Sequence, residues 1–231
     1  RFLFFLRKQA EFCGVEVLSH AVMSNHFHIL VRVPLEDEIS DKELMRRYRV
    51  LYTDERVPLS SLKPSELSKI LKKDGDEADE ERARLKLRMG DLSAFMRELK
   101  QRFGTWYNRT HKNMGTIWSN RFKSLLVEDC ANALSVVSAY IDLNAVRAEL
   151  VSDPAEYRYC SYSEAMGGNK DARKGLMSIY ESVTWRNTIA MYRLLLFGKG
   201  NRRKDVPRRQ GYGGSSKGGR MKDEGVISAD R

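Results

Sequence analysis

Two histidines separated by a single residue stand in an apolar segment near the start of the chain. In AVMSNHFHILVRVP, residues 21–34, His26 and His28 flank Phe27. Side chains two positions apart on a strand point to the same face, so both imidazoles could reach one cation. Two neutral histidines on the solvated face of a sheet would give the same pattern. The spacing alone leaves both interpretations open.

A tyrosine and an asparagine are separated by one helical turn in a second segment. In AYIDLNAVRAEL, residues 139–150, Tyr140 and Asn144 lie four positions apart and share one face of a helix. A free tyrosine hydroxyl is a weak nucleophile at neutral pH, and it becomes competent when a cation polarises the phosphate that it attacks. Tyr140 would be that nucleophile if the two imidazoles and the Asn144 amide oxygen held the cation. The alternative is that Tyr140 packs in the core with its hydroxyl satisfied.

Three motifs in the same order give these residues a context. MSNHFHILV, GTIWSNRFKS and YIDLNAVRAELV resemble the HUH-type single-tyrosine transposases, and among them the REP-associated tyrosine transposase branch of the insertion-sequence-200-like family. The name HUH denotes a histidine–hydrophobe–histidine strand. The resemblance covers roughly residues 1–165, apart from a charged stretch at 35–90. This sequence departs from the family at Ser24 and Ala145, where proline is usual.

The resemblance implies a chemistry, a cofactor and a substrate. Tyr140 would attack a phosphodiester of single-stranded DNA, form a 5′-phosphotyrosine and release a 3′-OH, which makes the chain a DNA endonuclease and strand transferase. His26, His28 and Asn144 would hold a divalent metal, Mg²⁺ or Mn²⁺. The DNA would carry imperfect-palindrome hairpins, and the protein would act as a monomer or a homodimer. Two other classes stay open: a non-catalytic, domesticated nucleic-acid-binding protein on the same scaffold, and a metal-dependent hydrolase of another substrate.

The composition favours a polyanionic partner. Lys and Arg number 41 against 31 Asp and Glu, for a formal charge of +10 and a pI of about 9.5. Such an excess points to nucleic acid before an anionic membrane surface. The three cysteines are widely spaced, and no apolar run is long enough to cross a bilayer. We therefore expect a cytoplasmic, nucleoid-associated protein without a membrane partner.

Basic and aromatic residues alternate around the second motif. Cations can contact phosphates while aromatic rings stack on unpaired bases. An aromatic residue at these positions can equally belong to the core. The predicted DNA-binding residues are Arg102, Arg109, Lys112, Trp118, Arg121, Lys123 and Arg147.

Local patterns predict the elements that must position these side chains. We expect a helix over 1–13, a hairpin over 15–33, a long helix from Asp91, a strand before 130 and a second long helix over 131–150. This order predicts an α+β fold, with helices on one face of a small antiparallel sheet. The resemblance implies a ferredoxin-like HUH nuclease core. The chain opens on Arg1 inside an apolar segment, so we expect residues upstream of it, including a first strand.

The charge and composition divide the chain into four parts. Residues 1–165 would form the catalytic domain, and the charged stretch at 35–90 would be a helical insertion in it. Residues 166–197 read as a helical C-terminal extension. Residues 198–231 are basic, rich in Gly and poor in large aliphatics, which predicts a disordered tail.

Overall fold

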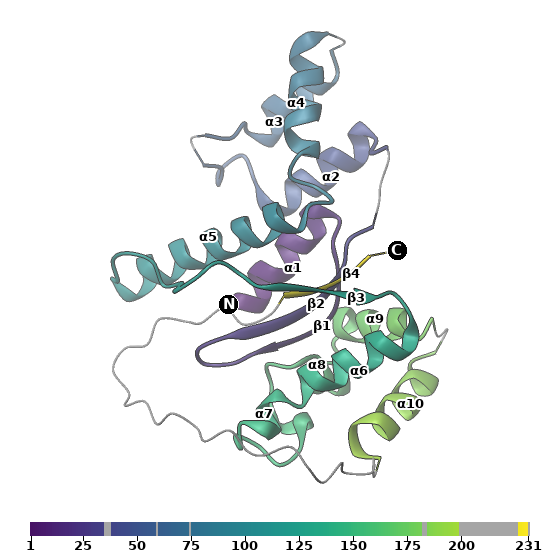
Figure 1. Cartoon of the computed structure of the whole chain (residues 1–231). Coiled ribbons are helices and arrows are strands. Elements are labelled where there is room, and N and C mark those ends of the chain that lie inside the picture. Colours follow the sequence, from purple (N-terminus) through teal and green to yellow (C-terminus); the bar gives the residue numbers. More distant parts are fainter. Residues whose placement is uncertain (35–37, 59, 74, 182–183, 199–225, 231) are drawn as a thin grey trace.

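A four-stranded sheet lies at the centre of the structure, a computed structural model that describes residues 1–34, 38–58, 60–73, 75–181, 184–198 and 226–230 (Figure 1). The strands are β1 (Glu16–Val22), β2 (Phe27–Arg32), β3 (Ser124–Glu128) and β4 (Val226–Asp230), in the spatial order β1-β2-β4-β3. β1 and β2 form the predicted antiparallel hairpin, with Val22 opposite Phe27. With its helices, the sheet confirms the α+β class.

The sheet is mixed, which corrects the prediction of an antiparallel one. β4 runs parallel to both of its neighbours, β2 and β3. β2 and β3 therefore point the same way. The long helical connection between them allows this, because it returns the chain to start a parallel strand, whereas a tight turn would give an antiparallel one. β4 also lies in the segment predicted to be a disordered tail, so that prediction is wrong for 226–230. The rest of that prediction, 199–225 and 231, falls outside the described residues.

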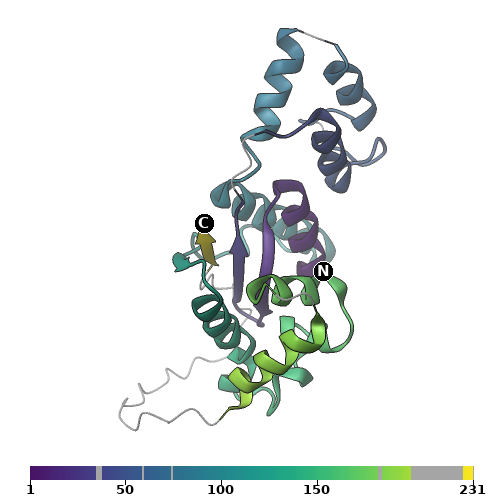
Figure 2. The ribbon, with the colours of Figure 1, turned by 90° about the vertical axis from the view of Figure 1, so that its right-hand side faces the viewer.

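Helices cover both faces of the sheet, whereas the sequence predicted helices on one face. α1 (Phe2–Cys13) and α5 (Leu92–His111) pack on one face, and α6 (Ala131–Asp142), α8 (Ser161–Met166), α9 (Lys170–Ile179) and α10 (Trp185–Phe197) lie on the other (Figures 1 and 2). Every residue of β2 is buried. Phe27 and Ile29 join the core on the α1 side, and Leu30 joins the core on the α6 side. A strand buried on both faces needs a layer on each.

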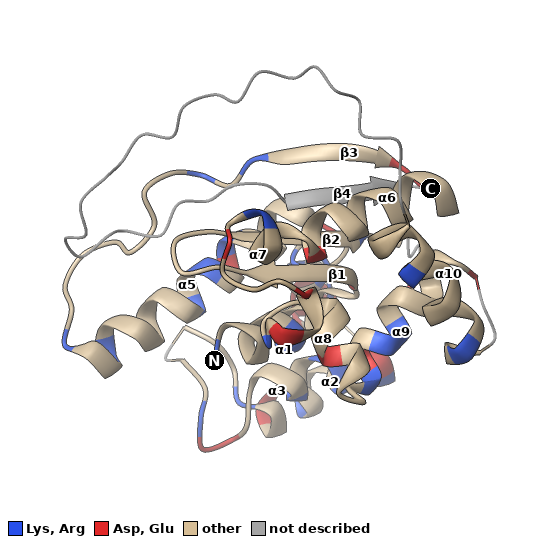
Figure 3. Ribbon diagram, turned by 90° about the horizontal axis from the view of Figure 1, so that it is seen from below, with Lys and Arg blue, Asp and Glu red and all other residues tan. Residues whose placement is uncertain are grey.

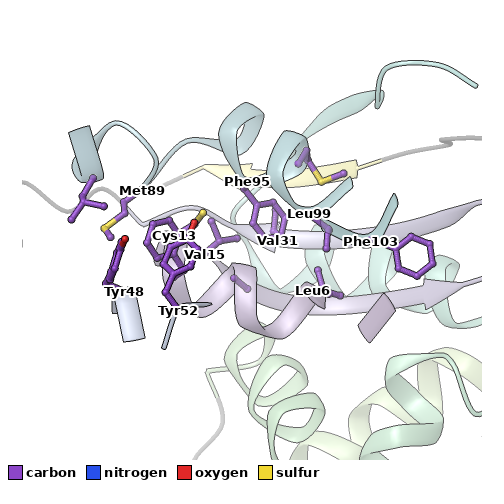
Figure 4. Packing of buried hydrophobic residues seen from close by; sticks show 14 of the residues in the cluster. Leu6, Cys13, Val15, Val31, Tyr48, Tyr52, Met89, Phe95, Leu99 and Phe103 are labelled. Carbon is purple, nitrogen blue, oxygen red and sulfur yellow. The ribbon is translucent and has the colours of Figure 1, made fainter. Parts of the chain in front are cut away.

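The charged insertion is helical, as predicted, and it shares the core of the α1 side. It contains α2 (Asp41–Leu51), α3 (Pro64–Leu71) and α4 (Asp76–Lys86). Tyr48 of α2 is fully buried and its Oη donates to the Leu62 carbonyl at 2.7 Å. Figure 4 shows Tyr48 and Tyr52 at one end of the same cluster that holds Leu6, Leu99 and Phe103. The insertion is therefore anchored to α1 by apolar packing.

The C-terminal extension is also helical and packs tightly on β1. A Cβ atom built at Gly175 of α9 would lie 2.5 Å from the Val17 carbonyl oxygen. Glycine therefore lets the α9 backbone approach the strand. Among the helices that the structure describes, none has both the length and the apolar character needed to cross a membrane.

Candidate active site

His26 and His28 lie together at the hairpin end of β2. Their ring centroids are 5.0 Å apart and the ring planes meet at 82°. Phe27 between them turns to the opposite face, where its ring lies 5.8 Å from that of Trp118. The strand alternation thus directs both imidazoles to the α6 side of the sheet. His28 is 8 % exposed, and His26 is half-buried.

The residue before His26 orients its ring. His26 Nδ1 lies 2.8 Å from Asn25 Oδ1. An amide oxygen only accepts, so Nδ1 donates in this hydrogen bond. A hydrogen bond of this kind is how metal-binding histidines are usually held in one tautomer. The sequence analysis missed Asn25, although an asparagine in the turn directly before the histidine strand is a signal for such a role.

α6 brings Tyr140 to the histidine pair. The Tyr140 and His28 ring centroids are 6.1 Å apart, with the planes at 79°. Tyr140 is 46 % exposed, which does not fit the alternative that it is a core residue. The Arg147 guanidinium lies over the Tyr140 ring, 4.3 Å from its centroid. The Tyr140 ring, the His28 imidazole and the Arg147 guanidinium thus lie together at one accessible point.

Asn144 lies one turn further, just after a break in the predicted long helix. α6 ends at Asp142, and a short helix, α7 (Asn144–Arg147), follows Leu143. The Asn144 Nδ2 atom donates to the carbonyls of Tyr140 and Ile141 at 3.0 and 3.1 Å. The amide side chain competes for carbonyls that would otherwise take helix N–H groups, which explains the break. Because both partners only accept, the nitrogen must face them and Oδ1 points away from them.

The donor set suits a divalent cation. Nε2 of His26, the His28 ring and the amide oxygen of Asn144 would be neutral ligands, and imidazole and carbonyl groups both serve as donors to divalent metal ions. The part of the chain that the structure describes contains no cluster of three or more His, Cys, Asp or Glu side chains that could hold a metal. A metal here would therefore depend on the asparagine amide as its third protein ligand.

A buried carboxylate, which the sequence analysis also missed, ties the tyrosine helix to the C-terminal extension. Asp142 is fully buried; it accepts from the Tyr192 hydroxyl of α10 at 2.5 Å and from the Tyr162 N–H of α8 at 3.0 Å. Tyr192 Oη also lies 3.0 Å from the Ser138 hydroxyl. Burial raises the pKa of Asp142 from 3.8 to about 6. The signal in the sequence is an acidic residue inside an otherwise apolar helix.

Five of the predicted DNA-binding cations lie on the surface, and one of them, Arg147, is beside Tyr140. Arg109 and Lys112 are exposed at the end of α5, and Arg121 and Lys123 are exposed in the segment before β3. Figure 3 shows Lys and Arg along this segment. With Arg147 beside Tyr140, they are placed to meet phosphates, and their DNA contacts stay predictions.

Arg102 and Trp118 point into the protein. The Arg102 guanidinium donates to Tyr52 Oη of the insertion at 2.6 Å. Trp118 is half-buried, its Nε1–H donates to the Lys100 carbonyl at 2.9 Å, and its ring lies 5.7 Å from that of Phe103. Trp118 therefore has the packing role that the sequence left open, and neither side chain joins the histidine–tyrosine cluster.

Comparison of the chain with protein-family models, with curated proteins and with solved structures finds no match in any of the three.

Proposed function

We propose that this chain is a metal-assisted DNA endonuclease and strand transferase that uses Tyr140 as its nucleophile. The observation that carries the proposal is the approach of an exposed tyrosine on α6 to the paired histidines of β2, 6.1 Å between ring centroids. These residues are about 110 positions apart in sequence, and the fold brings them together on one face of the sheet. The three motifs that resemble the HUH-type transposases support the same conclusion. On this proposal the sheet and its helices form a ferredoxin-like HUH core.

Each residue then has a role at the phosphate. Tyr140 Oη attacks the phosphorus, a Tyr–O–P bond forms and the P–O3′ bond breaks, and the leaving 3′ oxygen takes a proton from solvent to become a 3′-OH. The Tyr140 proton is lost to solvent, which reaches the exposed ring. Arg147, 4.3 Å from the ring, stabilises the negative charge that develops on the tyrosine and phosphate oxygens. The phosphotyrosine keeps the bond energy, so attack by a 3′-OH rejoins the strand without ATP.

His26, His28 and Asn144 would hold the metal. When bound, Mg²⁺ or Mn²⁺ would polarise the phosphate and neutralise its oxygens. Two imidazoles favour manganese over magnesium, because magnesium prefers oxygen ligands. Asn25 fixes the His26 ring, and the carbonyls of Tyr140 and Ile141 fix the Asn144 amide.

The substrate class follows from the charge and from the open site. The formal charge of +10 and the exposed cations at the end of α5 and before β3 favour a polyanion. On this proposal the partner is single-stranded DNA with imperfect-palindrome hairpins, in the cytoplasm at the nucleoid. The protein would work there as a monomer or a homodimer.

A denaturing gel tests the proposal. The chain is incubated with labelled, hairpin-bearing single-stranded DNA and Mn²⁺, and a covalent protein–DNA adduct is expected. Tyr140→Phe should abolish the adduct, whereas Tyr180→Phe, a half-buried tyrosine after α9 and outside the histidine cluster, should retain it. DNA binding without any adduct in the unmodified chain would instead support the non-catalytic binding protein.

A further inference from the structure

An aromatic groove lies beside the hairpin end of β1 and β2, where Val22, Met23 and Ser24 line it. Its volume is about 460 Å³, within the ~300–1,000 Å³ usual for sites that hold small organic groups. Met23 and Ser24 belong to the turn itself. The Met23 N–H donates to the His26 carbonyl at 2.8 Å, so the turn connects the groove directly to the histidine strand.

Aromatic rings from two distant segments form the walls. One wall is the end of α5, where Tyr107 stacks on His111 with centroids 4.1 Å apart and planes at 21°, beside Trp106. The other wall is the segment before α8, with Tyr157 and Tyr159 in edge-to-face contact at 5.9 Å.

Backbone contacts hold the second wall against β1. Tyr157 Oη donates to the Val22 carbonyl at 2.8 Å, and the Val22 N–H donates to the Tyr159 carbonyl at 3.0 Å. The Tyr159 side chain is nevertheless 43 % exposed. The wall is thus fixed through the backbone and Tyr157, while the Tyr159 ring is accessible to a ligand.

The charge around the groove suits a phosphate backbone. Among the described residues that line it, none is Asp or Glu. The Arg158 guanidinium lies over the Tyr159 ring, 4.9 Å from its centroid, and Arg109 and Lys112 are exposed at the end of α5. Aromatic faces for bases together with cations for phosphates are the combination that single-stranded nucleic acid binds.

We infer that this groove binds an unpaired nucleobase of the single-stranded DNA, next to the phosphate that Tyr140 attacks. This inference rests on the proposed function and adds a second contact to it. The strand passes over the hairpin turn, from the base in the groove that Met23 and Ser24 line to the phosphate at the histidine pair. Tyr159 supplies the stacking face.

An abasic scan tests the inference in a Tyr140→Phe background, where no cleavage intervenes. Fluorescence anisotropy gives the Kd of a hairpin DNA with a single-stranded extension, and of copies that lack one base at each position. We expect one or two positions at which base removal weakens binding roughly 5- to 150-fold, the range for one base–aromatic stack. Adding Tyr159→Ala should weaken binding of the intact DNA by a similar factor, and base removal at those positions should then cause no further loss of affinity.

Phe197→Ala is the matched control, because Phe197 is 46 % exposed and also lies beneath an arginine, Arg193 at 5.9 Å, but it does not line the groove. This variant should bind like the parent and keep the abasic penalty. An abasic penalty unchanged by Tyr159→Ala, or no sensitive position, would overturn the inference. Circular dichroism melts confirm that both variants fold. The adduct gel tests the proposed nuclease independently of this scan. If Tyr159→Ala removes the abasic penalty but the unmodified chain forms no adduct, the groove is retained and the nuclease is refuted.

Discussion

Asp142 gives a prediction in which the pH dependence of stability reports on the contact between the tyrosine helix and α10. Its pKa is raised by burial from 3.8 to about 6. A group whose pKa is raised on folding stabilises the fold fully below its unfolded pKa, and that stabilisation is lost as the pH rises through the folded pKa. The window is therefore pH 4 to 6. At ~1.36 kcal/mol for each unit of pKa, the loss is about 3 kcal/mol.

Asp142→Asn removes this titration and retains the hydrogen bonds. The Asn oxygen can accept from the Tyr162 N–H, its nitrogen can donate to Tyr192 Oη, and that hydroxyl can then donate to Ser138. The free energy of unfolding of the variant, relative to that of the parent protein, should therefore rise by about 3 kcal/mol between pH 4 and pH 7, with most of the change below pH 6.

Urea unfolding at half-unit steps of pH measures the difference. Other carboxylates titrate in the opposite sense: the arginine partners of Glu43, for example, lower its pKa to about 2, and that stabilisation is lost as the pH falls. These contributions are common to both proteins and cancel in the difference. The burial-driven rise in the pKa of Asp142 would be refuted by a difference in free energy of unfolding that does not change with pH. It would also be refuted if the parent protein became more stable relative to the variant as the pH rises.

Three further predictions concern other parts of the fold. Asn25→Ala should raise the Mn²⁺ concentration for half-maximal adduct formation ~10- to 100-fold, since an outer partner orients the ligand; an unchanged titration midpoint would contradict that role for Asn25. Gly175→Ala should lower the free energy of unfolding by ~1–3 kcal/mol or more in urea titrations, because the new Cβ meets the Val17 carbonyl. Gly104→Ala of α5, whose Cβ would meet its nearest atom at 3.5 Å, an ordinary van der Waals contact, tests the effect of the methyl group without such a clash. Ending the chain at Gly198 removes β4 from between β2 and β3 and should lower the melting temperature; a Tm within ~2 °C of the full chain would mean that β4 contributes less than about 1 kcal/mol.

The local elements could be predicted because each is encoded in neighbouring residues. α1 ends before Gly14, which takes the left-handed φ of 69° that glycine favours, and α5 begins after Asp91, whose carboxylate caps the Ala94 N–H. The spacing of His26 and His28 also sufficed to place both rings on one face. These patterns act over one or two turns or a few strand positions.

The arrangement of these elements depends on contacts that the sequence does not show. The position of β4 beside β2 depends on residues almost 200 positions away, and the five-residue stretch 226–230 carries no marked strand pattern. Arg102 resembled a surface cation because Tyr52, its partner, lies in the insertion, 50 positions earlier. Asp142 could not be recognised as buried before α8 and α10 were placed.

The identity of the residue that joins DNA is the most direct test of the proposed chemistry. The covalent adduct is digested with nuclease and protease, and mass spectrometry locates the nucleotide on its peptide. We predict a nucleotide 5′-phosphate on Tyr140 and a free 3′-OH on the released strand. A nucleotide on another residue such as Tyr107, or a 3′-phosphate linkage, would contradict the assignment of Tyr140 beside His26 and His28 as the nucleophile.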